Sequence, residues 1–427
     1  MAKRKKGILL GAVADDMTGA TDLCNTLVAS GMRTVQIIDV PKTGMAVPDA
    51  DAVVVALKSR NTQAIRAVRK SLKAMDWLKS AGAKQYFFKY CSTFDSTPSG
   101  NIGPVADAML ERAKGGITIA CPAFPTNGRT IFRGHLFVGD ELLSDSGMRN
   151  HPLNPMTDSN LVRVLGRQTA HKVGLVPRET IAAGPDAVVE AFESLKSSGH
   201  RHAIVDAVDD SDLMTIGAAC ANLRLITGGS GVALGLPENF RRANKLAAAQ
   251  PPALPRIDGS PAVLAGSCSV RTLEQVAEMK KAHPAFNLDA NAIAAGRDVV
   301  AEALNWAAGH IGETPFLIYS SADPENVKAV QSALGREESG AMIEQAMGEI
   351  AVGLVERGVG KLVVAGGETS GAVVQALGVQ ALRIGPEIEP GVPWTESMTG
   401  QPLALALKSG NFGGISFFAD ALDMLEQ

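Results

Sequence analysis

The most constraining feature of the sequence is an apolar run that ends on two adjacent carboxylates. Residues 8–14 read ILLGAVA, Asp15 and Asp16 follow, and apolar side chains then recur at helical spacing as far as Gly31. The run is too short for a helix and is typical of a strand buried on both faces. Asp15 and Asp16 are therefore predicted to lie where a central strand ends and a helix begins, the edge of an open α/β sheet at which ligands bind.

Either aspartate alone has an ordinary explanation, because an aspartate placed directly before a helix commonly caps it. Two adjacent carboxylates repel each other unless a cation or a substrate proton lies close by. We therefore expect Asp15 and Asp16 to serve function together.

Strand and helix patterns alternate along the rest of the chain, which predicts parallel sheets wrapped by helices. One predicted helix covers 104–114 with Pro104 at its first position. The rhythm breaks over 122–160, where a hairpin with Gly134 in its turn precedes a long irregular stretch. Two histidines in this stretch, His135 and His151, could contact substrate or could simply be solvated.

The expected fold class is α/β, with two domains that each hold a mainly parallel sheet flanked by helices, and an active site in the cleft between them. Residues 246–261, LAAAQPPALPRIDGSP, lack helical or strand periodicity and are predicted to form a linker. The predicted domains are therefore 1–245 and 262–427.

The composition excludes several classes of partner and compartment. A net charge of -3 over 427 residues argues against nucleic acid or a membrane surface as partner. The five cysteines show no metal or redox spacing, which fits thiols in a reducing cytoplasm. The start of the chain, MAKRKK followed by ILLGAVA, resembles a signal peptide, but its apolar part is short and two aspartates follow at once. We therefore expect a strand behind a basic tail, and a cytoplasmic protein. The sequence leaves open whether the chain forms a homodimer.

The second half contains three small-residue turns, each directly after a buried strand. They span 266–269, 366–371 and 408–414. Glycine lets a backbone approach a ligand closely, and a helix N-terminus offers free N–H groups to phosphate. Each turn alone is equally well explained as a tight turn, but three on one sheet edge favour a nucleotide site. No P-loop and no dinucleotide fingerprint occurs.

The first half places polar residues after its predicted strands. Arg60 follows the third strand, and the segment KYCSTFDSTPSGN at 89–101 follows the fourth. Lys89 and Arg60 could hold the carboxylate of a sugar-like acid, and the segment adds hydroxyl, amide and carboxylate groups. The candidate substrate-binding residues are Arg60, Lys89, Ser92, Asp95, Ser96 and Asn101.

At these residues the sequence resembles the four-carbon acid sugar kinase family, and most closely its 3-oxo-tetronate kinase branch. The resemblance is carried by AVADDMTGATD (12–22), KYCSTFDSTPSGNIGPVADAML (89–110), ACPAFPTNGRT (120–130), ITGGSGVA (226–233), AGSCSVRT (265–272), VVAGGETSGAVVQAL (363–377) and LKSGNFGG (407–414). It therefore spans both predicted domains. Ala265 stands where many relatives are expected to carry serine.

The resemblance implies a sugar-acid-binding first domain, a nucleotide-binding second domain, and ATP-dependent phosphorylation of the C4 hydroxyl of a 3-oxo four-carbon acid. It places ATP contacts at Ser267, Ser269, Gly366, Gly367, Glu368, Thr369 and Gly410. Phosphoryl transfer also calls for Mg2+ on the phosphate oxygens, with no dedicated protein metal site predicted. As a hypothesis, Asp16 orients or deprotonates the hydroxyl, and Asp15 is either its structural partner or an indirect metal ligand.

Three alternatives remain at this level. The first is a kinase for D-threonate or D-erythronate, and the second is a regulator that binds sugar acids without turnover. The third, a dehydrogenase, is disfavoured by the missing dinucleotide fingerprint.

Overall fold

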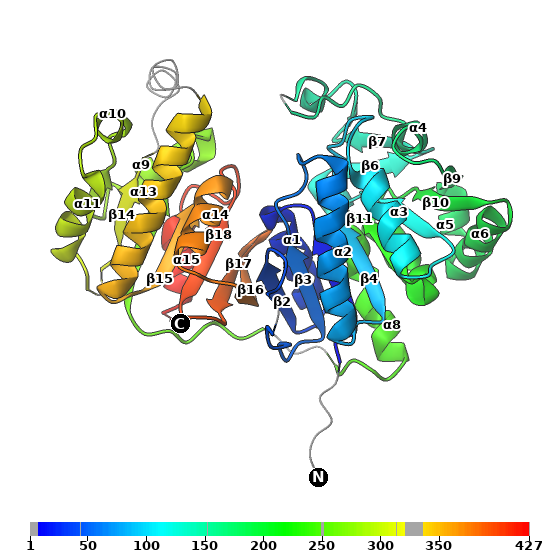
Figure 1. Cartoon of the computed structure of the whole chain (residues 1–427), viewed down its shortest axis with the longest axis horizontal. Helices are drawn as coiled ribbons and strands as arrows, with labels where there is room; N and C mark the ends of the chain where they lie inside the picture. The colour runs from blue at the N-terminus through cyan, green and yellow to red at the C-terminus, as the bar shows by residue number, and fades with distance from the viewer. Residues whose placement is uncertain are drawn as a thin grey trace, which may run out of the picture. The chain divides into compact units, whose positions relative to one another are not determined.

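The computed structural model describes residues 7–42, 44–151, 153–248, 252–312, 314–320 and 336–426, without the side chains of 336–339. The predicted basic tail at 1–6 and residues 249–251 of the predicted linker lie outside these ranges. The chain divides into two compact units, Met1–Pro251 and Pro252–Gln427. Each unit is an α/β structure in which strands and helices alternate along the chain (Figure 1).

The first unit contains a parallel sheet with strand order β2-β3-β1-β4-β11-β5-β10-β9. Its strands are β1 (Leu10–Ala14), β2 (Thr34–Ile38), β3 (Ala52–Ala56), β4 (Gln85–Lys89), β5 (Thr118–Cys121), β9 (Lys172–Val176), β10 (His200–Val205) and β11 (Leu225–Gly228). Its helices are α1 (Met17–Ala29), α2 (Ala64–Ser80), α3 (Ile102–Arg112), α4 (Leu161–Gly166), α5 (Arg178–Ala182), α6 (Pro185–Ser197), α7 (Asp210–Ala219) and α8 (Leu236–Arg242).

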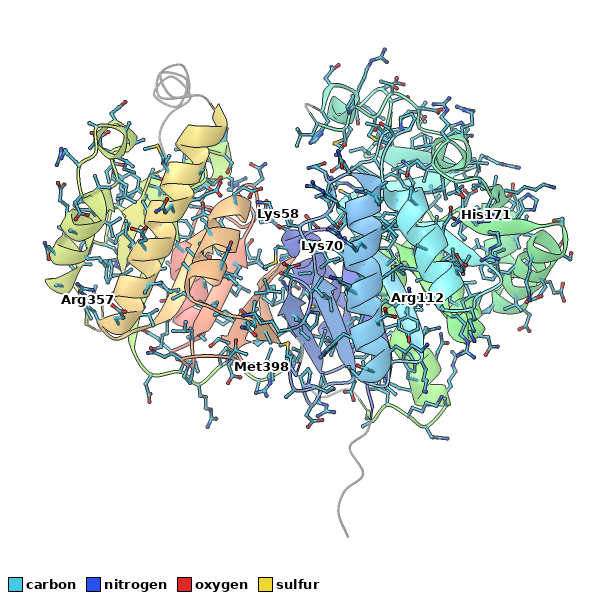
Figure 2. The ribbon with its side chains drawn as sticks, in the orientation of Figure 1. Lys58, Lys70, Arg112, His171, Arg357 and Met398 are labelled. Atoms are coloured by element: carbon cyan, nitrogen blue, oxygen red, sulfur yellow. The ribbon has the colours of Figure 1, made fainter. Side chains whose placement is uncertain are left out.

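The predicted strand at 8–14 is confirmed as β1, in which all five residues are buried. β1 lies beside β4, and the chain runs from β1 to β2 on one side of this pair and from β4 to β5 on the other. β1 therefore marks a topological switch point, where open α/β sheets form a crevice at the carboxyl ends of their strands. α2 and α3 pack side by side on one face (Figure 1). Arg112, labelled in Figure 2, lies at the end of α3 and forms an ion pair with Asp76 of α2.

The second unit has the strand order β13-β14-β12-β15-β18-β17-β16, parallel as far as β18 and antiparallel beyond it. Its strands are β12 (Ser260–Ala265), β13 (Ala285–Asn287), β14 (Phe316–Tyr319), β15 (Val359–Ala365), β16 (Ala381–Glu389), β17 (Val392–Ser397) and β18 (Ala404–Lys408). Its helices are α9 (Val270–Met279), α10 (Ala290–Ala294), α11 (Val299–Ala308), α13 (Arg336–Glu356), α14 (Gly367–Ala376) and α15 (Phe417–Met424). A core around Trp394 and Phe417 fills the space between α15 and the sheet.

Two local predictions need correction or extension. The helix α3 begins at Ile102, so Pro104 is its third residue and not its first. Proline is tolerated there because the first four N–H groups of a helix have no partner within it. The hairpin around Gly134 is confirmed as β6 (Arg129–Phe132) and β7 (His135–Val138), and an unpredicted third strand, β8 (Glu141–Leu142), joins it.

Within the described residues, every helix is too short or too polar to traverse a lipid bilayer.

Candidate active site

The first cluster of candidate residues forms where β1, β3 and β4 end side by side. Ala14 is in register with Ala56 on β3 and with Lys89 on β4. The backbone N–H groups of Ser59 and Arg60 donate to the Asp15 carbonyl at 2.9 and 3.2 Å, and the Asp15 N–H donates to the Lys89 carbonyl at 3.0 Å. Residues far apart in the sequence are thereby fixed at one edge of the sheet.

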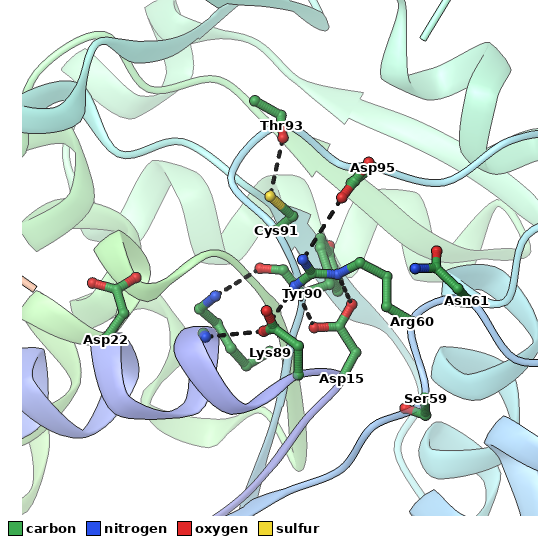
Figure 3. Close-up of polar contacts among 12 residues, drawn as sticks. Asp15, Asp22, Ser59, Arg60, Asn61, Lys89, Tyr90, Cys91, Thr93 and Asp95 are labelled. Atoms are coloured by element: carbon green, nitrogen blue, oxygen red, sulfur yellow. Dashed lines mark hydrogen bonds and ion pairs between the residues drawn. The ribbon is translucent and has the colours of Figure 1, made fainter. Parts of the chain in front are cut away.

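Arg60 is the cation that neutralises the aspartate pair. Its Nε and Nη2 atoms donate to the two carboxylate oxygens of Asp15, each at 2.8 Å (Figure 3). Nη2 also lies 2.8 Å from Oδ1 of Asp16. Burial raises the pKa of the Asp15 carboxyl, and the Arg60 guanidinium acts in the opposite direction. The neighbouring carboxylates raise the pKa of Arg60, so this guanidinium stays charged.

Asp16 has a second, structural task. It is the N-cap of α1, and its Oδ1 accepts the Gly19 N–H at 2.9 Å. Both the capping explanation and the cluster explanation of the sequence therefore apply to this residue. A Cβ at Gly19 would lie 2.4 Å from the same Oδ1 and 2.9 Å from Nζ of Lys89, so only glycine fits beside this carboxylate without displacement.

Lys89 brings a second cation to the cluster. Its side chain is buried, and its Nζ donates to the Tyr90 carbonyl at 2.9 Å (Figure 3). An ammonium group carries three N–H donors, and in the described part of the chain this is the one hydrogen bond that Nζ makes.

The loop after β4 contributes the remaining candidates, which differ in what they contact. Ser92 is half-buried, whereas Ser96 is buried and its Oγ accepts a hydrogen bond from Gln168 at 3.0 Å. Asn101 is buried, and its Nδ2 reaches the carbonyls of residues 59, 60 and 62 at 2.9 to 3.0 Å. Asn101 therefore clamps the loop that carries Arg60. Oδ2 of Asp95 lies 3.6 Å from Nη1 of Arg60 (Figure 3).

The second cluster forms in the other unit, where the neighbouring parallel strands β12, β15 and β18 end. The three glycine-containing turns predicted from the sequence follow these strands and contact one another. A Cβ at Gly410 would lie 2.3 Å from Oγ of Ser267 and 2.8 Å from Oγ of Ser269, so the third turn touches the first. Ser269 also caps α9, because its Oγ accepts the Thr272 N–H at 3.3 Å.

The middle turn opens α14. Gly366 has φ +126, a conformation that favours glycine, and precedes Gly367, Glu368 and Thr369 in the first turn of the helix. Gly367 and Glu368 are exposed, while Thr369 is buried with its Oγ1 close to Gly266 and Gly366. The N–H groups at the start of a helix have no intrahelical partner and attract anions.

Two further residues hold this second cluster together. Lys408 is buried, and its Nζ donates to the carbonyls of Ser409 and Gly410, both at 3.0 Å, and to Oγ1 of Thr272 at 3.3 Å. Thr272 in turn donates to the Gly410 carbonyl at 2.8 Å. Burial lowers the pKa of Lys408 to about 8.

Lys408 and Thr272 were not predicted as site residues. The signal for Lys408 is a lysine that ends an otherwise apolar strand, whereas nothing in the local sequence distinguishes Thr272. The same is true of Gln168, which holds Ser96 from a distant part of the chain.

Comparison with known proteins finds a matching family for each of the two units. Residues 10–236 match the family described as "Sugar-binding N-terminal domain", and residues 262–418 match the "Nucleotide-binding C-terminal domain". A curated 3-oxo-tetronate kinase from Burkholderia multivorans is 60% identical over 98% of this chain and 97% of its own length. Another from Cupriavidus necator is 59% identical with the same coverage. The crystal structure of a Haemophilus influenzae protein, 42% identical, matches with a TM-score of 0.86 over 97% of this chain and 100% of that chain.

Proposed function

The chain belongs to the four-carbon acid sugar kinase family, and we propose that it transfers the γ-phosphoryl group of ATP to the C4 hydroxyl of a 3-oxo-tetronate, giving the 4-phosphate and ADP. The observation that carries this proposal is the near full-length similarity to curated 3-oxo-tetronate kinases. The substrate is a small anionic polyol, and both clusters of the chain offer groups that suit one of the two reactants.

The sugar acid is proposed to bind at the cluster of the first unit. Arg60 already pairs with the aspartates, so Lys89, whose ammonium has N–H donors beyond its bond to Tyr90, is the better partner for the substrate carboxylate. Ser92 and the Asp95 carboxylate are suited to the substrate hydroxyls. Ser96 and Asn101 are proposed to act here mainly by shaping the loop, because Gln168 and the backbone carbonyls engage them.

ATP is proposed to bind at the cluster of the second unit. Ser267, Ser269 and Gly410 would contact the nucleotide from two turns, and Gly366 to Thr369 would present helix N–H groups to its phosphates. The described residues contain no group of three or more His, Cys, Asp or Glu side chains that could hold a metal ion. We propose that Mg2+ binds the ATP oxygens and neutralises phosphate charge there, as phosphoryl transfer from ATP requires.

Asp16 remains the candidate that the sequence names for orienting or deprotonating the C4 hydroxyl, with Asp15 in support. Their bonds to Arg60 also give both a role in fixing that guanidinium. All five cysteines are free, which suits the proposed setting in a reducing cytoplasm, where ATP is available.

A substrate panel tests the proposal directly. The purified chain is incubated with ATP and a 3-oxo-tetronate, D-threonate, D-erythronate or no acceptor, and ADP release is followed by a coupled assay. Rapid ADP release with the 3-oxo acid alone, together with a 4-phosphate signal by phosphorus NMR, supports the proposal. Turnover confined to threonate or erythronate would move the chain to another branch of the family, and binding without ADP release would make it a regulator.

A further inference from the structure

Asp95 differs from the other two carboxylates of the first cluster in having a buried oxygen without a hydrogen-bond partner. The residue is 8% exposed, and its Oδ2 faces Arg60 at 3.6 Å. Its Oδ1 is buried and makes no hydrogen bond within the described part of the chain. A buried acceptor left without a donor is unfavourable, because it has lost its hydrogen bonds to water and gained none from the protein. Such a cost points to a donor that arrives with a ligand.

A nearby histidine, His151, does not supply the donor. Nδ1 of His151 lies 3.8 Å from Oδ1 of Asp95, but Nδ1 already accepts the Asn154 N–H at 3.1 Å. The neutral ring therefore carries its proton on the other nitrogen. Asn154 is held in turn by its Nδ2, which donates to Oδ1 of Asn61 at 2.7 Å.

The backbone holds Asp95 in place at some cost. Phe94 and Asp95 have φ values of 61 and 43, the left-handed region that non-glycine residues rarely adopt. Phe94 is fully buried, with its ring 5.5 Å from that of Tyr90, and this packing anchors the turn. Strained backbone of this kind persists only where the surrounding packing enforces it, and it clusters at active sites.

Asp15 and Asp16 are differently placed. Both oxygens of Asp15 accept hydrogen bonds from Arg60, and Asp16 accepts the Gly19 N–H through Oδ1, the oxygen that also lies 2.8 Å from Arg60. Oδ2 of Asp16 makes no hydrogen bond within the described residues, but the side chain is 30% exposed, so water can reach it. A carboxylate 2.8 Å from a guanidinium is a weaker proton acceptor than one 3.6 Å from it, because the closer cation stabilises the ionised form more.

We infer that Asp95 is the catalytic base of the proposed kinase reaction, an inference that rests on the proposed function. Oδ1 of Asp95 accepts the hydrogen bond of the C4 hydroxyl and takes its proton as the O–H bond breaks. The hydroxyl oxygen forms the new bond to the γ-phosphorus, and the bond from that phosphorus to the β,γ-bridging oxygen breaks, leaving its electron pair on ADP. The proton on Asp95 is then released to solvent.

Asp95→Asn tests the inference, because asparagine keeps the size of the side chain and cannot take the proton. We expect kcat to fall by about 100-fold or more, the usual contribution of a general base. Asp49→Asn is the matched control, since Asp49 is an exposed carboxylate that also pairs with an arginine, and it should keep wild-type kcat. Thermal melting establishes that each variant is folded.

Asp95→Ala, assayed with and without formate, gives a second measurement that does not depend on the asparagine variant. Added formate should restore part of the lost kcat, whereas Asp16→Ala should gain nothing from it. A folded Asp95→Asn enzyme that keeps more than a tenth of kcat, or rescue of Asp16→Ala in place of Asp95→Ala, overturns the inference and returns the base to Asp16. A wild-type chain that releases no ADP with any sugar acid overturns the proposed function itself, and the inference with it.

Discussion

Gly410→Ala offers a sharp test of the proposed nucleotide site. An ideal Cβ at this position would lie 2.3 Å from Oγ of Ser267, 2.8 Å from Oγ of Ser269 and 3.1 Å from Cβ of Ser269. Contacts below 3.0 Å do not occur at real Cβ atoms, so the serine hydroxyls must rotate away or the two turns must separate. Either response disturbs the atoms proposed to contact ATP and leaves the core of the unit intact.

The size of the effect follows from the contacts at risk. Hydrogen bonds to a charged phosphate contribute about 1.5–3 kcal/mol each, and every 1.4 kcal/mol is about tenfold in Kd. Loss of one serine contact therefore predicts an ATP Kd raised about 10-fold to 150-fold. Stability should change far less, because the displaced atoms are the ends of small side chains near the surface.

Calorimetric titration of ATP measures this effect, with Gly371→Ala as the matched control. Gly371 lies in α14 beside the same cluster, has no atom within 4 Å of its ideal Cβ, and should tolerate alanine with unchanged ATP affinity. In the Ser267→Ala background the shortest clash is gone and only the contact with Ser269 at 2.8 Å remains, so adding Gly410→Ala there should weaken ATP binding less than it does in wild type. Wild-type ATP affinity in Gly410→Ala would refute the reasoning.

Three more predictions concern the residues that hold the two clusters. The pKa of Lys408 is lowered from 10.5 to about 8, so between these two pH values the unfolded chain binds one proton more than the folded chain. The free energy of unfolding of wild type should therefore rise with pH relative to that of Lys408→Met. Urea unfolding of both proteins at pH 7.5 and 9.5 measures this gap in stability, taken as wild type minus variant, and a gap that decreases as pH rises would contradict the prediction. Arg60→Met leaves the buried Asp15 without its cation and should lower the free energy of unfolding by about 3–5 kcal/mol, with partial recovery in Arg60→Met/Asp15→Asn. Asn101→Ala removes the side chain that clamps three carbonyls of the loop carrying Arg60. It should lower the free energy of unfolding by about 1–3 kcal/mol and raise KM for the sugar acid. An unchanged KM would show that the loop keeps its conformation without Asn101.

The fold could be predicted largely because the local signals are strong. The strand at Leu10–Ala14 and the strands before the glycine turns are short apolar runs bounded by turn residues, and the structure confirms them. The start of α3 could not be placed, because proline is acceptable at any of the first helical positions and Pro104 fixes none of them. The strand β8 has two residues, too few for any periodic signal.

The sites were predictable in their location and less so in their contacts. The rule that parallel strands end at a common edge brings Asp15, Arg60 and Lys89 together from their sequence positions alone. The rule does not say which groups pair with one another. That Arg60 pairs with Asp15, and that Asn101 clamps the loop that carries Arg60, depends on long-range packing that no single segment encodes.

The charges of the first cluster lead to one further prediction. Asp15, Asp16 and Asp95 lie near two cations, Arg60 and Lys89, so one negative charge is in excess before an anionic substrate arrives. Two like charges roughly 6 Å apart at an effective dielectric constant of about 20 repel by about 2–3 kcal/mol before screening. Asp95→Asn should therefore bind the sugar acid with a Kd equal to that of wild type or up to about tenfold lower, while its turnover falls. Calorimetric titration of the acid without ATP measures this. A Kd raised more than tenfold would instead make Asp95 a group that holds the substrate, because its carboxylate would then be contributing binding energy in the ground state.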